Sequence, residues 1–298
     1  MTAPIVLLVN PAAGRGRAAG VARAAHRALT TAGLRVDVHE TRARGDEAAI
    51  AQDASAVGAR ALAVVGGDGA ISHAVRGLLE GEARGGARVP LAIFAAGTGN
   101  DFAKSLTVPV HHAERMAAHV AAGATHHVDV GFVNDVPFVN AAGFGFDVDV
   151  LQRMRTPGLL RGTAAYVSTA LGALLGYRGF HAGLTTDATG MRRTLMIVFA
   201  NGRCFGGAFR IAPNAQLDDG ALDCITIRDV APWARVPLFA NAIRGKHLSS
   251  PHVVFRRSHT FELQFEAPPL FETDGELQQA PGREVTVRVQ PGALTVIA

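Results

Sequence analysis

The chain has 298 residues, of which 48% are hydrophobic and 18% charged, and its formal net charge is +4. This composition excludes a disordered chain and allows a globular protein of two domains. The two cysteines, Cys204 and Cys224, exclude a disulfide framework and predict free thiols. No signal-peptide pattern opens the chain, and the longest uncharged apolar stretch, residues 163–177, is shorter than the ~20 residues needed to cross a bilayer. We therefore expect a cytoplasmic protein.

The charge is distributed unevenly along the chain. Residues 151–260 contain 14 Lys and Arg against 5 Asp and Glu, so the remainder is net acidic. A basic middle region favours an anionic partner, and the lack of interleaved aromatic residues argues against nucleic acid. The sequence thus predicts peripheral contact with the anionic inner face of a membrane, while a solvated arginine-rich surface is the plain alternative. It leaves the oligomeric state open, a homodimer included.

The first part of the chain alternates buried apolar runs with alanine-rich helical segments. The expected strands are 5–9, 34–39, 61–65 and 91–95, and the expected helices are 17–32, 46–58, 70–80 and 112–122. Strands that alternate with helices predict a mostly parallel, helix-covered sheet. We expect a Rossmann-like α/β nucleotide-binding domain over residues 1–127, to which the chain end, residues 282–298, returns.

After residue 128 the pattern changes to short β-like segments separated by glycine, proline and aspartate. The expected strands are 137–140, 183–187, 194–200, 222–228, 260–266 and 284–289, which predict an antiparallel β-sandwich over residues 128–281. Helical segments interrupt it at 148–177 and 232–246. One helix face is expected to pack in the core or to form a wall for an acyl chain, and it carries Val167, Ala170, Leu171, Leu174 and Leu175. Trp233, the sole tryptophan, is expected to pack in the interior.

Three glycine-containing loops each follow a predicted strand, where an α/β sheet presents its ligand site. The first comprises Asn10, Pro11, Ala12, Ala13, Gly14, Arg15, Gly16 and Arg17. Glycines allow several backbone N–H groups to face one anion, and the following helix adds its positive end. The loop is not a Walker A motif, because G-x-x-x-x-G-K-[ST] is missing. An ordinary strand-to-helix turn would also contain glycine.

The second and third loops add oxygen ligands to the glycines. The second loop comprises Gly66, Gly67, Asp68, Gly69 and Ala70, and the third comprises Gly97, Thr98, Gly99, Asn100 and Asp101. A carboxylate at the mouth of a phosphate-binding loop can hold Mg²⁺, whereas the plain role of Asp68 is to cap a helix. Because all three loops follow parallel strands, we expect them to converge on one edge of the sheet and to bind a nucleotide with Mg²⁺.

These loops belong to a longer pattern that runs nearly from end to end of the chain. It comprises NPAAG, GGDGA, GTGNDFA, VDVGFVN, FVNAAGFGFDVDV, NGRCFGGAFRIAPNAQLDDGALD and the final Asp274-Gly275-Glu276. In this combination the chain resembles the diacylglycerol kinase catalytic-domain family, which includes bacterial diacylglycerol kinases, sphingosine kinases and ceramide kinases. The resemblance implies an ATP-dependent lipid kinase with its site in the cleft between an α/β domain and a β-sandwich. Diacylglycerol is the expected lipid alcohol and phosphatidic acid the product.

The resemblance also implies residue roles. The positions expected to contact ATP are Asn10 to Gly14, Thr41, Gly67 to His73, and Thr98. Asp68 and Asp101 fall where the family places carboxylates near phosphate and the catalytic Mg²⁺. Gln216, Asp219 and Ala221 align with a second, structural Mg²⁺ site. Glu276 is implied as the proton acceptor, with Asp274 close to the reacting hydroxyl; the plain alternative for this turn is a link between two strands.

Two departures from the family pattern bear on activity. The family usually has Ser or Thr where Ala13 stands and Thr where Ala70 stands, so two phosphate-facing hydroxyls are missing. At ~1 kcal/mol for each hydrogen bond, their loss weakens ATP binding several-fold without abolishing it. An NAD kinase, which shares the GGDG motif, is the enzymatic alternative, and a nucleotide- or lipid-binding protein without turnover is the non-enzymatic one.

Overall fold

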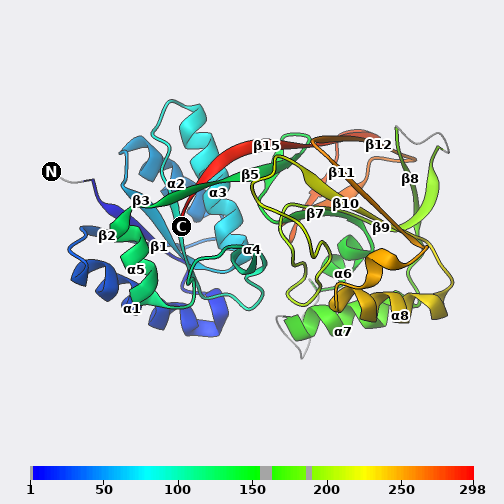
Figure 1. Ribbon diagram of the computed structural model, residues 1–298, viewed down its shortest axis with the longest axis horizontal. Coiled ribbons are helices and arrows are strands. Elements are labelled where there is room, and N and C mark those ends of the chain that lie inside the picture. The colour runs from blue at the N-terminus through cyan, green and yellow to red at the C-terminus, as the bar shows by residue number, and fades with distance from the viewer. Residues whose placement is uncertain (1–2, 155–162, 186–189) are drawn as a thin grey trace. The chain divides into compact units, whose positions relative to one another are not determined.

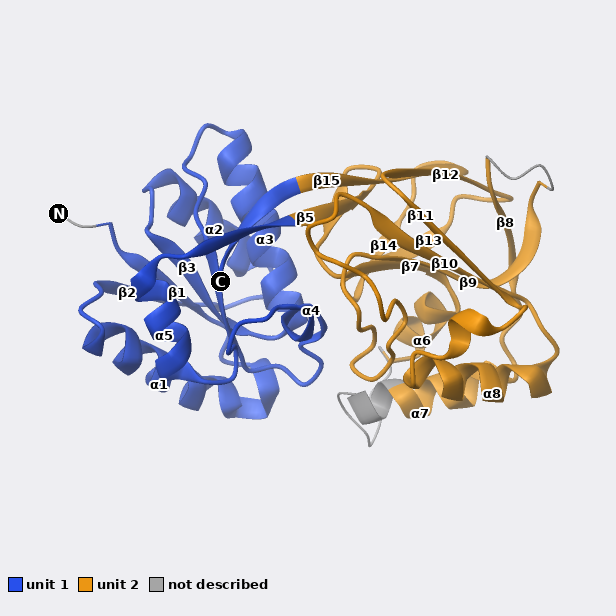
Figure 2. Cartoon of the chain, viewed as in Figure 1, with its two compact units in different colours: residues 1–128, 292–298 blue, residues 129–291 orange. Residues whose placement is uncertain are grey.

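The computed structural model describes residues 3–154, 163–185 and 190–298, with the side chains of 163–166 excepted. The chain forms two compact units (Figure 2). Unit 1 comprises residues 1–128 and 292–298, and unit 2 comprises residues 129–291. Among the described residues, no helix combines the length and the apolar character that a bilayer crossing requires.

Unit 1 is built on a parallel sheet. Its strands are β1 (Ile5–Val9), β2 (Val36–Glu40), β3 (Ala61–Gly66) and β4 (Leu91–Ala95), which pair in the order β4-β3-β1-β2. Its helices are η1 (Ala13–Gly16), α1 (Arg17–Thr31), α2 (Asp46–Ala56), α3 (Asp68–Ala83), α4 (Asp101–Ser105) and α5 (Ala113–Ala122) (Figure 1). This is the helix-covered parallel sheet that the sequence predicts.

Both faces of the central strands are covered by helices. Every residue of β1, β3 and β4 is buried, as expected where the alternate side chains of a strand point to two covered faces. Helix α1 packs with α5 and α2 packs with α3. One face of the sheet forms a core with α1 and α5 through residues such as Leu7, Leu29 and Met116. Gly77 allows the second helix pair to pack closely, because a Cβ there would lie 2.2 Å from the carbonyl oxygen of Ala48.

Unit 2 is an antiparallel β-structure, which confirms the predicted sandwich. Its strands are β6 (Val136–Phe138), β7 (Ala141–Gly145), β8 (Phe180–Leu184), β9 (Arg192–Ala200), β10 (Leu222–Arg228), β11 (Val253–Ser258), β12 (Thr260–Phe265), β13 (Leu270–Thr273) and β14 (Glu276–Gln279). Strands β5 (Thr125–Val133) and β15 (Glu284–Ile297) each run from one unit into the other. Stacked and tilted phenylalanines, Phe144, Phe265 and Phe271 among them, fill the core between the strands.

Helices cover the outer face of one layer of unit 2. They are α6 (Phe146–Met154), α7 (Thr163–Leu174) and α8 (Pro232–Ile243), with the short turn η2 (His247–Ser249) after them. Alternate residues of β9 face the two cores: Ile197 and Phe199 point into the sandwich, whereas Met196 and Val198 point to the helices. The strand is therefore apolar on both faces, which explains its continuous hydrophobic run.

Several expectations from the sequence need correction. The expected helical segment 148–177 contains two helices, and residues 155–162 of it lie outside the described residues, as do residues 186–187 of the expected strand 183–187. Leu171 and Leu175, expected on a buried helix face, are 48% and 57% exposed. Trp233, expected in the interior, is 79% exposed, because the first turn of α8 points it away from the core. The two cysteines are free thiols, as predicted.

Candidate active site

The three glycine loops of unit 1 meet at the carboxyl edge of its sheet. The loops after β1, β3 and β4 comprise residues 10–17, 66–70 and 95–101, and we call them the loop cluster. Gly66 accepts hydrogen bonds through its carbonyl oxygen from the amides of Ala96, at 2.8 Å, and Gly97, at 3.2 Å. The amide of Asn10 donates to Val65 at 3.0 Å. The predicted convergence of these loops is confirmed.

Glycine is required in the cluster because the backbones touch. A Cβ on Gly97 would lie 2.5 Å from the Cα of Gly67, and a Cβ on Gly14 would lie 1.9 Å from the carbonyl oxygen of Ala96. Real Cβ atoms do not approach backbone atoms so closely. Gly14, Arg15 and Gly16 also follow one another with φ of 61°, 60° and 87°, a left-handed turn that glycine adopts without strain. The amides of such a turn can face one anion.

Arg17 ties two of the loops together. Its guanidinium donates to the carbonyl oxygens of Gly14, at 3.1 Å, and Gly97, at 3.0 Å. These bonds fix the first loop against the third before any ligand arrives. The donors of this arginine are therefore directed to backbone carbonyl oxygens.

Two carboxylates and one amide provide the oxygen ligands of the cluster. Asp68 begins α3 and accepts from the backbone amides of Asp101, at 2.6 Å, and Phe102, at 3.4 Å, so it caps α4 from a neighbouring loop. Asp101 accepts from the ammonium of Lys104 at 2.9 Å. The buried Oδ1 of Asn100 has no hydrogen-bond partner among the described residues, although its Nδ2 donates to Gly97. An acceptor buried without a donor at this position suits a bound cation or a ligand N–H or O–H group.

A second group of polar residues borders the first loop. The side-chain amide of Asn10 donates to Glu47 at 2.9 Å, and the ring Nδ1 of His73 lies 3.5 Å from the other oxygen of Glu47. Burial opposes ionisation of Glu47, but bonds from His73 and from the backbone amides of Glu47 and Gly45 outweigh it and hold its pKa below the ordinary value. Thr41 is buried, and its amide donates to the carbonyl oxygen of Val9 at 2.9 Å. Glu47 therefore fixes two residues expected to contact ATP.

The two alanine departures differ in exposure. Ala70 is buried and packs against the end of β3, where a Cβ on Gly66 would meet its methyl group at 2.5 Å. Ala13 is partly buried against the core of unit 1, while Pro11 and Ala12 are exposed. Thr98 is exposed on the third loop, which leaves a hydroxyl at the cluster.

In unit 2, Asp274 and Glu276 belong to a two-residue hairpin between β13 and β14. Thr273 pairs with Glu276, and Asp274 and Gly275 have φ of 49° and 87°, as in a type I′ turn. Asp274 accepts from three backbone amides, those of Val139 at 2.9 Å, Asn140 at 2.9 Å and Ala141 at 3.1 Å. These bonds anchor the hairpin to the start of β7 and orient its carboxylate.

Two buried carboxyl groups lie behind this hairpin. Glu272 accepts the amide of Gly275 at 2.6 Å. A Cβ on Gly143 would lie 1.8 Å from Oδ2 of Asp147 and 3.1 Å from Oε1 of Glu272, so those oxygens are no more than 4.9 Å apart, the sum of the two distances. Burial raises the pKa of Asp147 to about 7, although the amides of Val148 and Asp147 at the start of α6 favour ionisation. Asp147 therefore retains its proton close to neutral pH beside Glu272.

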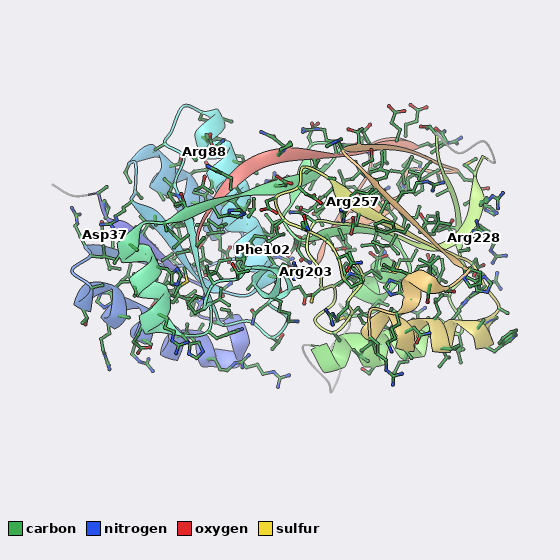
Figure 3. All side chains as sticks on the ribbon, in the orientation of Figure 1. Asp37, Arg88, Phe102, Arg203, Arg228 and Arg257 are labelled. Carbon is green, nitrogen blue, oxygen red and sulfur yellow. The ribbon has the colours of Figure 1, made fainter. Side chains whose placement is uncertain are left out.

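The loop expected to bind a second Mg²⁺ is held by protein contacts. Arg257 on β11 (Figure 3) lies 3.2 Å from Asp219 and 2.7 Å from Asp223. The other carboxylate oxygen of Asp219 accepts the amide of Ala221, and the buried Asp129 accepts the amide of Gly220 at 2.6 Å. The described residues contain no cluster of three His, Cys, Asp or Glu suited to a metal ion. Arg257 already lies against Asp219, and the second Mg²⁺ site implied for Gln216, Asp219 and Ala221 stays a prediction.

Family models match both parts of the chain. Residues 4–133 match the diacylglycerol kinase catalytic domain, and residues 140–298 match the YegS C-terminal NAD kinase beta sandwich-like domain. The chain belongs to the diacylglycerol kinase catalytic-domain family of lipid kinases. It is thus an enzyme of the class that phosphorylates an alcohol group.

Relatives of this family cover most of the chain. It is 30% identical over 276 residues to a diacylglycerol kinase of Mycobacterium tuberculosis, a match that covers 87% of this chain and 84% of that protein. It is 27% identical to a diacylglycerol kinase of Bacillus subtilis (82% and 80% covered) and 30% identical to a YegS-like lipid kinase of Pseudomonas aeruginosa (92% and 88% covered). A solved structure of a diacylglycerol kinase from Bacillus anthracis has the same fold, with a TM-score of 0.74 at 24% identity over 99% of this chain and 96% of that one.

Several residues of the site carry no signal that sequence reasoning could use. Glu47 resembles any acidic residue in a first helical turn, and the role of Arg257 depends on carboxylates more than 30 positions away. Asp147 and Glu272 become neighbours only because β7 pairs with β13. The motifs identified the loops, and the fold added the residues that hold them.

Proposed function

We propose that this enzyme transfers the γ-phosphoryl group of ATP to the hydroxyl of diacylglycerol and releases phosphatidic acid and ADP. The observation that supports it most is the loop cluster, in which three glycine loops contact one another through their backbones and present amides, a buried amide oxygen and two carboxylates. Aligned amides of this kind bind phosphate, and phosphoryl transfer asks the protein mainly for positioning and charge neutralisation.

The donor set of the cluster fits a nucleotide-bound Mg²⁺. Mg²⁺ takes one or two carboxylates together with phosphate oxygens and water, and Asp68 and Asp101 supply two carboxylates joined through a 2.6 Å hydrogen bond from the amide of Asp101. When bound, the ion would offset the charge of the phosphate oxygens. The loop amides would hold the phosphates, and Arg17 would keep the first and third loops together.

Glu276 is proposed as the proton acceptor. The lipid hydroxyl oxygen forms a bond to the γ-phosphorus, the bond from that phosphorus to the β,γ-bridging oxygen breaks, and the hydroxyl proton passes to the Glu276 carboxylate. Asp274 is assigned to hold and orient the hairpin, because three backbone amides already occupy its oxygens. General-base catalysis of this kind contributes about 10²–10⁴-fold to the rate.

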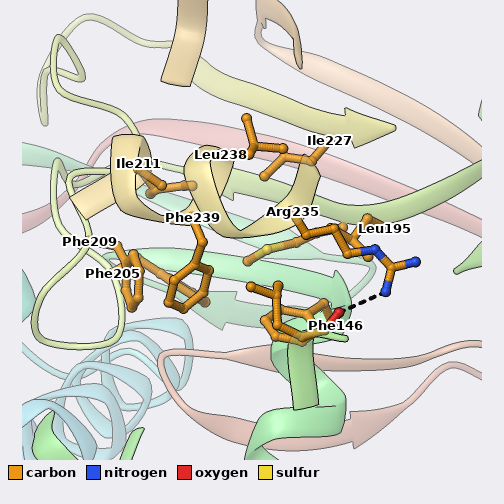
Figure 4. A pocket seen from close by; sticks show the side chains of 12 residues that line it. Phe146, Leu195, Phe205, Phe209, Ile211, Ile227, Arg235, Leu238 and Phe239 are labelled. Atoms are coloured by element: carbon orange, nitrogen blue, oxygen red, sulfur yellow. Dashed lines mark hydrogen bonds between the residues drawn. The ribbon is translucent and has the colours of Figure 1, made fainter. Parts of the chain in front are cut away.

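Unit 2 offers apolar space for acyl chains. A cavity of about 390 Å³ has a mixed lining, with apolar side chains such as Phe144, Phe180 and Phe265 beside polar ones such as Asp149, Gln152 and Glu266. A volume in this range is typical of small-ligand pockets. A smaller apolar cavity of about 40 Å³ lies among α8, the end of α7 and β9 (Figure 4). The phenylalanines of the larger cavity, in the unit that carries Glu276, favour diacylglycerol over a water-soluble alcohol such as NAD.

The test is transfer of labelled γ-phosphate from ATP to diacylglycerol in detergent micelles, with NAD as a second acceptor. We expect labelled phosphatidic acid and no labelled NADP. Glu276→Gln should lower kcat at least ~100-fold, while Glu284→Gln, a change at an exposed position on β15, should leave it unchanged. Labelled NADP would assign an NAD kinase instead. ATP binding without transfer to any acceptor would assign a binding protein.

A further inference from the structure

Helices α7 and α8 contain one charged residue between them, Arg235, and it is buried. Their outward faces therefore carry no charge. Ten large hydrophobic residues of the described chain are exposed, and five of them belong to these two helices or to the residue after α7: Leu171, Leu175, Trp233, Val236 and Ile243. The two helices pack against each other on one side of unit 2 (Figure 2), and their exposed residues are taken together as one surface. We call this the α7–α8 face.

The pattern on α8 is unusual for a surface helix. The exposed positions Trp233, Val236, Pro237, Ala240 and Ile243 follow helical spacing, and every one is apolar. The sole charge of the helix, Arg235, points inward, is 5% exposed and donates to the carbonyl oxygen of Leu174 at 2.7 Å (Figure 4). A surface helix normally places its charges outward, and here the arrangement is reversed. A contiguous exposed apolar surface of this kind marks an interaction site.

The borders of the face are cationic. Arg178 follows α7, Arg244 and Lys246 follow α8, and Arg228 projects from the end of β10 shortly before α8 begins (Figure 3); all four are exposed. Residues 150–186 and 230–261 contain no Asp or Glu at all. Asp229, between Arg228 and α8, is already paired with Arg193 at 2.8 Å and Arg235 at 2.7 Å.

This combination identifies the occupant as an anionic lipid surface. Apolar side chains with an exposed tryptophan insert at the boundary of head groups and acyl chains, and arginine and lysine at the border attract anionic head groups. A second copy of this chain would place like charges against each other, which opposes a symmetric dimer through this face.

We propose that the α7–α8 face docks the enzyme on an anionic membrane, with the side chain of Trp233 inserted at the interface. This inference rests on the proposed function, because an enzyme that phosphorylates a membrane lipid must reach it in the bilayer. The inner sides of the same helices, through Leu174, Leu238 and Ala242, line the small apolar cavity. The face that meets the bilayer is therefore continuous with the apolar interior of unit 2.

Trp233 is the sole tryptophan and reports directly on the proposal. We expect its fluorescence to shift to shorter wavelength with vesicles of phosphatidylcholine and phosphatidylglycerol, and to be quenched by lipids with brominated acyl chains. Vesicles of phosphatidylcholine alone should give a weaker effect. Cosedimentation with the anionic vesicles without any change in tryptophan emission would overturn the proposal, as would the absence of binding.

Variants separate docking from catalysis. Trp233→Ser combined with Val236→Ser should lower vesicle binding at least ~10-fold, in line with the burial of two large side chains. The double variant Arg244→Gln/Lys246→Gln should lower it by roughly five-fold per charge. Phe255→Ser, at an exposed aromatic residue of β11, and Arg23→Gln/Arg27→Gln on α1 are the matched controls and should bind as wild type.

Activity on two substrates distinguishes this inference from the proposed function. With a short-chain diacylglycerol dissolved in water, the Trp233→Ser/Val236→Ser variant should turn over as wild type, and with diacylglycerol in vesicles it should lose activity in parallel with binding. Equal loss on both substrates would overturn docking and place the helix in the substrate pocket.

A change from dimer to monomer in light scattering would assign the face to a second copy. Absence of turnover in wild type would reject the proposed function, while the fluorescence result still decides docking.

Discussion

Gly97 and Gly67 set how closely the second and third loops approach each other. Neither has a positive φ, so their requirement for glycine is one of space and not of backbone conformation. A methyl group on Gly97 would meet the backbone of Gly67, which cannot rotate away as a flexible side chain would. We predict that Gly97→Ala separates the loops, weakens ATP binding at least ~10-fold and lowers the free energy of unfolding by about 1–3 kcal/mol. Titration calorimetry and urea unfolding measure the two effects.

Gly20 on α1 provides the matched control for this change. A Cβ there would meet no atom within 4 Å, and the residue lies inside a helix of the same unit. Gly20→Ala should stabilise the protein by up to ~1 kcal/mol through helix propensity and leave ATP binding unchanged. If Gly97→Ala bound ATP as tightly as Gly20→Ala, the contact between the loops would not shape the nucleotide site.

Asp147 makes stability depend on pH. Its pKa is about 7 in the folded protein and 3.8 as the ordinary value, so the unfolded chain loses this proton at lower pH than the folded one. Asp147 therefore contributes its full stabilisation below about pH 3.8, and this contribution is lost as the pH rises to about 7. At 1.36 kcal/mol for each pH unit, the total loss is ~4 kcal/mol. Asp147→Asn removes this decline, since an amide stays neutral across this pH range.

Urea unfolding from pH 4 to pH 8 measures the prediction. The free energy of unfolding of Asp147→Asn should exceed that of wild type by a few kcal/mol at pH 8, and the difference should shrink steadily toward pH 4. Asp149→Asn, on the same helix, controls for loss of a carboxylate from α6. A constant difference across this range would show that Asp147 does not carry the buried proton.

At the scale of elements, Arg235 joins α7 to α8. Its guanidinium donates to the carbonyl oxygens of Leu174 and Tyr177 at the end of α7, to that of Val230, and to the carboxylate of Asp229. We predict that Arg235→Met costs about 3–5 kcal/mol of unfolding free energy, because it leaves buried carbonyl groups without donors and weakens the neutralisation of Asp229.

An exposed arginine shows how much of this cost comes from burial. Arg76 pairs with Glu80 four residues along α3, and both side chains are well exposed. Arg76→Met should cost less than about 0.5 kcal/mol in the same urea titration. Similar costs for the two variants would mean that the buried network around Arg235 does not hold the helices together.

The sequence predicted those elements whose hydrophobic pattern was continuous. Strands β1, β4 and β10 lie at their expected residues because each is an apolar run between turns. Strands β5, β7, β11, β13 and β14 were missed. Of these, β7 is rich in alanine and glycine and β14 is polar. Gly143 of β7 is needed where Asp147 and Glu272 lie, and β14 forms as the return arm of the Asp274 hairpin. Contacts between distant segments decide both strands, and local propensity does not report such contacts.

For the helices, the sequence predicted burial at positions that the structure exposes. An apolar face on α7 was read as core, yet Leu171 and Leu175 are exposed while Ala170 and Leu174 are buried. Periodicity separates apolar from polar faces, but it cannot separate them on a helix without any charged residue. On α8 the sole charged residue, Arg235, is buried, so the pattern does not show that Trp233 points outward either. Residues of the loop cluster were found because phosphate-binding turns have a recognisable composition, whereas Glu47 and Arg257 have none.

At the scale of the whole molecule, the end of the chain completes unit 1. Residues 292–298 belong to that unit, although the rest of β15 pairs with β12 in unit 2. Val296 pairs with Leu91 of β4, and the amide of Ala298 donates to Ala124 at 3.0 Å. A last strand segment thus stabilises the sheet whose loops are proposed to bind the nucleotide.

Removing this segment should affect unit 1 selectively. A chain that ends at Pro291 loses the buried side chains Leu294, Val296 and Ile297, each at most 3% exposed, and at ~1.5–3 kcal/mol for each this amounts to about 5 kcal/mol or more. We predict that hydrogen exchange accelerates in β4 and that ATP binding is lost, while the amides of β9 keep their protection. A chain that ends at Ile297 loses one backbone hydrogen bond and should behave as wild type. Retained protection in β4 after truncation at Pro291 would show that unit 1 is stable without its last strand segment, and that the return of the chain serves another purpose.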